Sequence, residues 1–130
     1  MSTVLLDSHV VHWWAADPGR LSPGSATAIG DARELAVAGV TWFELAWLVT
    51  NGRLQSRIPL RGWLDQLARE IRTLPLTTAV AARAAALPAT FPRDPADRVI
   101  FATAQETGYR LVTRDLRMRE HDVARDIVIW

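Results

Sequence analysis

Four acidic residues lie where apolar segments end or where helices are expected to begin. Asp7 follows the apolar segment 3–6, and Asp115 follows the segment 111–114. Glu44 comes shortly after the apolar run 35–40, and Asp97 follows Asp94-Pro95-Ala96. In an open parallel sheet the carboxyl ends of the strands face one crevice, where ligands bind. Acids gathered there repel one another unless a cation lies among them, and Mg²⁺ and Mn²⁺ prefer oxygen ligands. This pattern indicates metal-assisted phosphate chemistry.

The elements that would hold these acids follow an α/β pattern. Apolar segments typical of strands recur at 3–6, 35–40, 74–76, 111–113 and 127–130. The intervening stretches are long enough for the helical crossovers that parallel strands require. We therefore predict one domain over residues 1–130, a three-layer α/β/α sandwich with a central, mostly parallel sheet.

Helix signals fill the intervals between the predicted strands. Ser22-Pro23 and Asp94-Pro95 each read as an N-cap followed by proline in the first turn. Thr41 and Glu44 form the pattern of a capping box before an apolar run. A helix is expected over 60–72, another opens at Thr78, and the helix after Asp94 should stop at Gly108.

Composition narrows the possible functions. There is no cysteine, which excludes disulfides, zinc–thiolate sites and thiol nucleophiles. All 15 basic residues are arginine, so mechanisms that need a lysine are excluded as well. No segment is apolar and long enough to cross a membrane or to resemble a signal peptide, and we expect a cytoplasmic protein. If the four acids form a site, the rest of the chain has 15 basic and 10 acidic residues and is therefore net positive. Such a positive environment around an acidic site suits a polyanionic substrate.

Each acid also has an explanation that involves no chemistry. Asp7 could be a helix N-cap, Glu44 the third residue of the capping box, and Asp115 the start of a turn. Asp97 lies in a first helical turn, where the helix dipole favours a negative charge. Asp94 is interpreted as an N-cap rather than as a fifth site residue. His9 and His12, at i and i+3, could in principle bind a metal, but no third nitrogen or sulfur ligand accompanies them.

Four segments taken together resemble a known family, the PIN-domain ribonucleases, and in particular the VapC toxins of bacterial type II toxin–antitoxin systems. The resemblance covers nearly the whole chain. It is carried by Leu5-Leu6-Asp7-Ser8-His9, Thr41-Trp42-Phe43-Glu44-Leu45-Ala46, Asp94-Pro95-Ala96-Asp97-Arg98-Val99-Ile100-Phe101-Ala102-Thr103-Ala104 and Leu111-Val112-Thr113-Arg114-Asp115. The third and fourth segments are the most specific. One departure is His121-Asp122-Val123, which replaces the aromatic–glycine element usual near the last strand of the family.

The resemblance implies a metal-dependent endoribonuclease that uses Mg²⁺ or Mn²⁺. Asp7 and Asp97 would bind the metal directly, Glu44 would hold its water shell or a second ion, and Asp115 would complete the site. Thr113, Ser8 and Arg98 would support these residues. The implied partners are an RNA substrate, a second copy of the chain in a homodimer, and a small antitoxin that joins a hetero-oligomer. An arginine from the antitoxin could replace the metal's positive charge.

Two alternatives belong to other functional classes. A phosphotransfer or phosphatase domain also places an acid after its first strand, but a receiver domain needs an adjacent acid pair and a lysine. A dehalogenase-type phosphatase needs a second Asp where His9 stands. A non-catalytic PIN-fold binding module is the other alternative, and we expect such a protein to have lost some of the acids. The sequence leaves open which RNA is cleaved, and whether Trp13, Trp14, Trp42, Trp47 or Trp63 contacts RNA, a partner or only the core.

Overall fold

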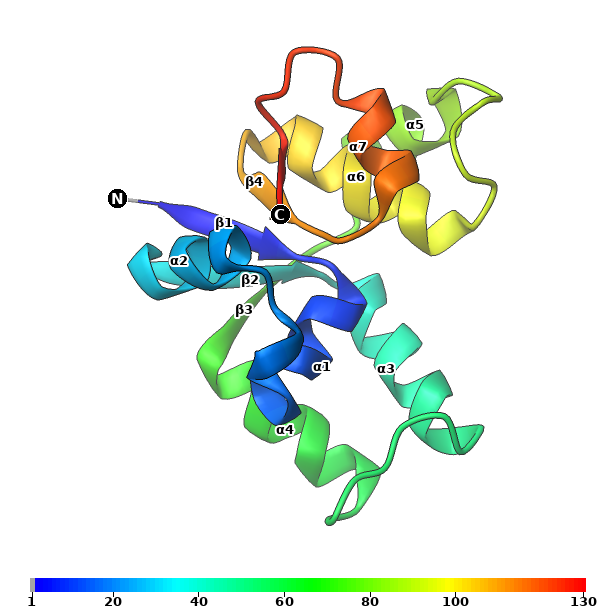
Figure 1. The fold of residues 1–130 in the computed structure, drawn as a ribbon. Helices are drawn as coiled ribbons and strands as arrows, with labels where there is room; N and C mark the ends of the chain where they lie inside the picture. Colours follow the sequence, from blue (N-terminus) through cyan, green and yellow to red (C-terminus); the bar gives the residue numbers. More distant parts are fainter. Residues whose placement is uncertain (1) are drawn as a thin grey trace.

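The computed structural model describes residues 2–130 of the chain. Within this range it contains a five-stranded sheet in the order β3-β2-β1-β4-β5, and all four strand pairings are parallel (Figure 1). The strands are β1 (Thr3–Leu6), β2 (Glu34–Ala38), β3 (Ile71–Leu74), β4 (Arg110–Val112) and β5 (Val128–Ile129). The helices are α1 (Ser8–Ala16), η1 (Pro18–Arg20, a 3₁₀ turn), α2 (Pro23–Asp31), α3 (Val40–Thr50), α4 (Leu60–Glu70), α5 (Thr78–Ala86), α6 (Pro95–Thr107) and α7 (Leu116–His121).

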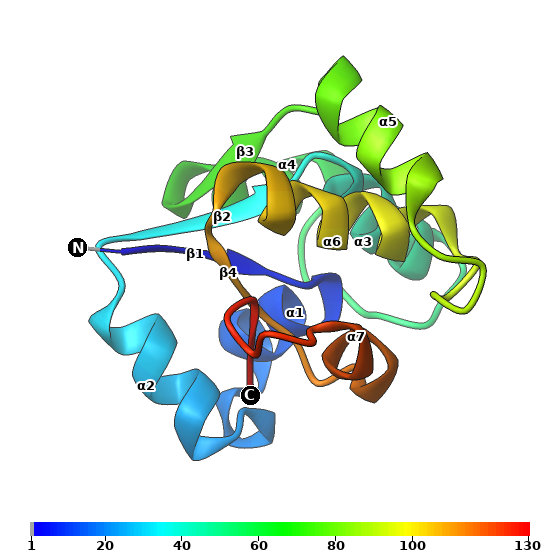
Figure 2. The ribbon, with the colours of Figure 1, turned by 90° about the horizontal axis from the view of Figure 1, so that it is seen from above.

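Helices cover both faces of the sheet, which confirms the predicted three-layer sandwich. Side chains alternate along β1, so Val4 and Leu6 face one core and Leu5 faces the other. The first core includes residues of α1, α3 and α4, and the second includes residues of α6 and α7. Seen from above, α5 lies alongside α6, which runs across the sheet (Figure 2). Helices on both faces of the sheet explain why the strand sequences are apolar without alternating polar residues, since neither face of these strands is exposed to water.

Two strands differ from their predicted bounds by two residues or more at one end or both, and the other strands differ by at most one residue. The strand expected at 74–76 lies at 71–74, because α4 ends at Glu70 and Ile71 pairs with Leu35. The β-branched Ile71 and Thr73 favour an extended backbone over another helical turn. The strand expected at 35–40 ends at Ala38, since α3 already begins at Val40.

Most of the predicted helix ends are confirmed. The Ser22 hydroxyl accepts a hydrogen bond from the backbone N–H of Ser25, and Asp94 accepts one from the N–H of Asp97. Gly108 ends α6 with φ of 76°, a left-handed conformation that glycine adopts at little cost. The N-cap of α5 is Thr77, one residue before the predicted start.

Asp122 organises the C-terminal edge, where the sequence departs from the family. Its buried carboxylate accepts hydrogen bonds from the backbone N–H groups of Asp126, Ile127 and Val128, at 3.2, 3.0 and 2.8 Å. These bonds close the loop that delivers β5 to its place beside β4. Among residues 2–130, no helix is long and apolar enough to span a bilayer.

Candidate active site

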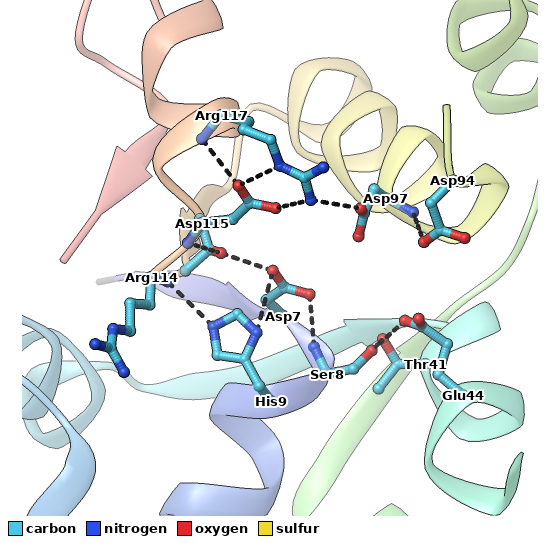
Figure 3. Close-up of polar contacts among 11 residues, drawn as sticks. Asp7, Ser8, His9, Thr41, Glu44, Asp94, Asp97, Arg114, Asp115 and Arg117 are labelled. Atoms are coloured by element: carbon cyan, nitrogen blue, oxygen red, sulfur yellow. Dashed lines mark hydrogen bonds and ion pairs between the residues drawn. The ribbon is translucent and has the colours of Figure 1, made fainter. Parts of the chain in front are cut away.

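The four predicted site acids lie together at the carboxyl edge of the sheet (Figure 3). Asp7 follows β1 and Asp115 follows β4, and these strands are neighbours with Leu6 opposite Val112. Asp97 lies in the first turn of α6, and Glu44 lies one turn into α3. Each acid therefore comes from a different element, and the parallel topology is what gathers them.

Asp7 is the most firmly held of these acids. Only 4% of its surface is exposed, and it caps α1 by accepting a 2.7 Å hydrogen bond from the N–H of Ser8. Its other carboxylate oxygen accepts a 2.6 Å hydrogen bond from the Thr113 hydroxyl. That hydroxyl also accepts a bond from the N–H of Asp115, at 3.0 Å, so it links two of the acids. Asp7 is both a helix cap and a site residue, and the two roles do not compete.

His9 lies beside Asp7 in a fixed orientation. Its Nε2 accepts a hydrogen bond from the backbone N–H of Arg114 at 3.1 Å, so a neutral ring carries its proton on Nδ1. Nδ1 lies 3.7 Å from Oδ2 of Asp7. His12 does not join it: burial lowers the pKa of His12, and among the described residues its Nδ1 has no hydrogen-bond partner. Within residues 2–130, neither histidine belongs to a group of three possible metal ligands.

Glu44 is held by Ser8 rather than by a capping box, so that prediction was wrong. The N-cap of α3 is Gly39, and no side chain caps the helix. Thr41 therefore lies inside the first turn, where its buried hydroxyl is 3.1 Å from the Ser8 hydroxyl. Ser8 donates a 2.5 Å hydrogen bond to Oε1 of Glu44. Burial raises the pKa of Glu44, the Ser8 bond opposes the rise, and the charges of the neighbouring Asp7 and Asp94 add to it.

Asp97 carries the largest electrostatic perturbation in the site. Burial and the nearby carboxylates, Asp7 first among them, raise the pKa of Asp97 to about 7. Asp94 lies exposed at the start of α6, and its carboxylate accepts a 3.2 Å hydrogen bond from the N–H of Asp97. This bond confirms Asp94 as the cap that positions Asp97. A carboxyl group with such a pKa is costly to ionise until a positive charge arrives.

A positive charge of the chain itself already lies among the acids. Arg117 in α7 is bound to Asp115 at 3.2 Å, and its Nη2 lies 3.7 Å from Oδ2 of Asp97 (Figure 3). Burial alone would raise the pKa of Asp115, but hydrogen bonds from the Arg117 side chain and backbone and its charge hold that pKa below the usual value. No local pattern predicts the ion pair between Arg117 and Asp115, because residues at i and i+2 do not share a helix face.

The arrangement suits a hard cation in charge and in donor chemistry. Carboxylate oxygens are the ligands that Mg²⁺ and Mn²⁺ accept, and Mg²⁺ is commonly held by one or two carboxylates with water filling the other positions. Within residues 2–130, no three acidic or histidine side chains converge closely enough to hold one ion jointly.

The comparisons with known proteins identify the family of this fold and site. Residues 4–124 match the family model described as the PIN domain. The chain belongs to the PIN-domain family. Among curated PIN relatives, it is 56% identical over 130 residues to ribonuclease VapC22 of Mycobacterium tuberculosis (strain ATCC 25618 / H37Rv), and the match covers 100% of both chains. The predicted resemblance to VapC-type ribonucleases is thereby confirmed.

Solved structures with the PIN fold share little sequence with this chain. VapBC-1 from nontypeable Haemophilus influenzae superposes with a TM-score of 0.71 at 14% identity, covering 97% of this chain and 95% of that chain. FitAcB from Neisseria gonorrhoeae gives 0.64 at 24% identity, with coverages of 96% and 95%. VapBC from Salmonella typhimurium, bound to DNA, gives 0.69 at 19% identity, with coverages of 98% and 97%. These likenesses support the PIN-like fold class.

Arg98 supports the PIN site in a different way from the one predicted. Its guanidinium donates to the backbone carbonyls of residues 84, 87, 88 and 92, at 3.0–3.1 Å. It also lies 5.8 Å from the ring centre of Phe91, a buried residue in the same loop. Within the described chain it forms no ion pair with an acid. Arg98 fixes the loop that leads into α6, and so places Asp94 and Asp97 indirectly.

The tryptophans of the PIN domain divide into packed and exposed ones. Trp13 is 8% exposed, and its ring is 4.8 Å from that of His9. Trp14, Trp42 and Trp63 pack against the first core, which includes residues of α1, α3 and α4. Trp47 is 58% exposed and lies on α3 beside Phe43, which is 66% exposed. Of the five candidates for contact with RNA or a partner, Trp47 presents the most surface.

Proposed function

We propose that this chain is a metal-dependent endoribonuclease and the toxin of a toxin–antitoxin pair. The observation that carries this proposal is the convergence of Asp7, Glu44, Asp97 and Asp115 at the carboxyl edge of the sheet. Full-length identity of 56% to a ribonuclease supports it further. A receiver or dehalogenase-type phosphatase is incompatible with the family. Since all four acids are present and gathered, nothing favours a non-catalytic binding module.

The metal, Mg²⁺ or Mn²⁺, would be held by Asp7 and Asp97, with Asp115 and Glu44 completing the site. Burial, together with the charges of neighbouring acids, raises the pKa values of Asp97 and Glu44, and a bound cation would relieve the repulsion among the acids. When bound, such an ion would lower the pKa of a coordinated water and neutralise charge on the phosphoryl oxygens. No lysine or cysteine is present to supply other chemistry.

The other residues of the site would fix these carboxylates in place. Thr113 holds Asp7 and the backbone of Asp115 through one hydroxyl group. Ser8 holds Glu44 and, through its N–H, Asp7. Hydrogen bonds of this kind orient metal ligands, and their loss commonly costs affinity or activity. Arg117 supplies a positive charge where negative charge would otherwise stand unpaired.

The proposed partners are a second copy of this chain and a small antitoxin. Several structurally similar proteins are VapBC or toxin–antitoxin complexes, which supports an antitoxin partner. The exposed rings of Phe43 and Trp47 on α3 add an apolar surface next to Glu44, of the kind that protein partners cover. Co-expression with the product of the neighbouring upstream reading frame tests this. We expect a stable complex, and its absence on gel filtration would contradict the antitoxin proposal.

Cleavage of total RNA tests the enzymatic proposal. We expect the purified protein to cleave RNA with Mn²⁺ or Mg²⁺ and to be inactive in EDTA, and we expect Asp97→Asn and Asp7→Asn to abolish cleavage. Asp65→Asn is the matched control, because Asp65 is an exposed acid of α4 paired with Arg61. Mapping the 5′ ends of the fragments would identify the RNA class. Cleavage by Asp97→Asn at the native rate, or full activity in EDTA, would contradict the proposal.

A further inference from the structure

Two grooves border the acid cluster, and they differ in charge. The first, which we call the Trp47 groove, has a volume of about 410 Å³ and lies between α3 and α6. It is apolar apart from Glu44 and Asp94, so both of its charged side chains are acids. The second, a shallow surface depression that we call the His9 groove, has a volume of about 430 Å³. Its walls are His9, Trp13, Arg114, Asp115, Leu116 and Arg117.

The His9 groove begins at the acids themselves. Asp115 and Arg117 belong both to the groove and to the acid cluster. His9 connects the two regions as well, since its Nδ1 faces Asp7 at 3.7 Å and its Nε2 accepts the N–H of Arg114 at 3.1 Å. The Arg114 side chain leaves the cluster on the His9 side and points away from the carboxylates (Figure 3).

Arg114 is free to meet a negatively charged ligand. Among residues 2–130, its guanidinium forms no ion pair with an acid, in contrast to Arg117, which contacts both Asp97 and Asp115. It lies 5.9 Å from the ring centre of Trp13, and the guanidinium of Arg20 lies 4.9 Å from the same ring. The mostly buried Trp13 thus holds two guanidinium groups near its ring through cation–π contacts, and of these two arginines Arg114 is the one that lines the His9 groove.

We propose that the His9 groove binds the phosphate backbone of the RNA strand next to the cleaved bond, with Arg114 as the main contact. This inference rests on the proposed ribonuclease function and deepens it. The charged side chains of the Trp47 groove are both acids, Glu44 and Asp94, which repel a polyanion. The His9 groove carries two arginines, Arg114 and Arg117, beside Asp115, so its charge is more favourable to a polyanion. Arginine suits this role because its planar guanidinium can donate two hydrogen bonds to one phosphate.

Salt-dependent binding of RNA tests the proposal. The probe is a fluorescein-labelled 15-nucleotide uridine RNA, measured by fluorescence anisotropy in EDTA at several NaCl concentrations. We expect Arg114→Gln to weaken binding severalfold and to flatten the slope of log K against log[NaCl] by about 0.7, the loss of one phosphate contact on a single strand. Arg114→Lys keeps the charge, so its slope should stay close to the native one.

Arg69→Gln is the matched control, because it removes the same charge elsewhere. Arg69 is exposed and lies two residues before β3, at the amino edge of the sheet opposite the acids. Equal slopes for Arg114→Gln and Arg69→Gln would overturn the proposal. The proposal would also be overturned if Trp47→Ala weakened RNA binding while Arg114→Gln bound RNA as the native protein does. That result would assign the RNA strand to the Trp47 groove. Absence of both cleavage and binding by the native protein would instead count against the ribonuclease function itself.

Discussion

Asp97 holds its proton more tightly than an ordinary aspartate does, so metal binding should depend strongly on pH near neutrality. Burial and the charges of the neighbouring acids raise the pKa of Asp97 to about 7. A metal ion that binds this carboxylate must displace the proton. We therefore expect the affinity for Mn²⁺ to rise steeply between pH 6 and pH 8 and to level off above that range.

The size of this effect follows from the pKa. A group with a pKa near 7 is ionised in about one-tenth of the molecules at pH 6 and about nine-tenths at pH 8. The apparent dissociation constant for Mn²⁺ should therefore fall about tenfold over this range, with release of about half a proton at pH 7. Asp94→Asn should weaken the dependence, since Asp94 is one of the charges that raise the pKa of Asp97. An asparagine there can still cap α6.

Isothermal titration calorimetry provides the assay. Mn²⁺ is titrated into the native protein at pH 6, 7 and 8, in buffers of different ionisation enthalpy that count the released protons. Asp65→Asn serves as the control, because it removes an acid from the exposed face of α4 and should leave the profile native. A dissociation constant that stays constant from pH 6 to 8, with no proton release, would refute the reasoning. Asp97 would then be ionised throughout.

Four further predictions concern stability and the cation of the site. Because the pKa of Asp97 rises from 3.8 to about 7 on folding, the metal-free folded state binds more protons than the unfolded state between these values. Stability should therefore decrease as pH rises from about 4 to 7, and in urea titrations Asp97→Asn should lack this component. Arg117→Gln removes a cation that competes with the metal for the carboxylates, so calorimetry should show Mn²⁺ binding roughly fivefold more tightly. Weaker binding of Mn²⁺ would show instead that Arg117 helps to form the site. Thr113→Val removes the 2.6 Å bond to buried Asp7 and should cost about 1–3 kcal/mol of unfolding free energy in urea, with loss of RNA cleavage. Arg98→Met removes hydrogen bonds to four backbone carbonyls, of which those of residues 84 and 88 keep a backbone donor, and should cost about 2–3 kcal/mol. A native urea midpoint would contradict the role of this side chain.

The sequence predicts those parts of the site that depend on chain direction and local signals. Apolar runs that end in an acid locate Asp7 and Asp115, because parallel strands share one carboxyl edge. The Asp94-Pro95 pair locates the start of α6, since an N-cap and a first-turn proline are local features. These signals place Asp7, Asp97 and Asp115 correctly at one edge of the sheet.

Contacts between elements far apart in the chain could not be predicted from the sequence. Ser8 binds Glu44 across 36 positions of the chain, and the local capping pattern at Thr41 pointed to a different partner. Arg98 turns away from the adjacent Asp97 because four carbonyls, from the last turn of α5 and the loop that follows it, converge on its guanidinium. Arg117 reaches Asp97 only because α6 and α7 begin at the same edge. Such pairings depend on tertiary geometry, which no local pattern encodes.

The hydrogen bond between Thr113 and Asp7 joins residues 106 positions apart, and this separation bears on when the enzyme becomes active. Asp97 and Asp115 also come from the last third of the chain, while the central strand β1 is synthesised first. During translation, β1 can pair with β2 early, but it gains β4 only after residues 110–112 have been synthesised. The acid cluster therefore cannot be complete before Asp115 has been added, long after the central strand on which it is built.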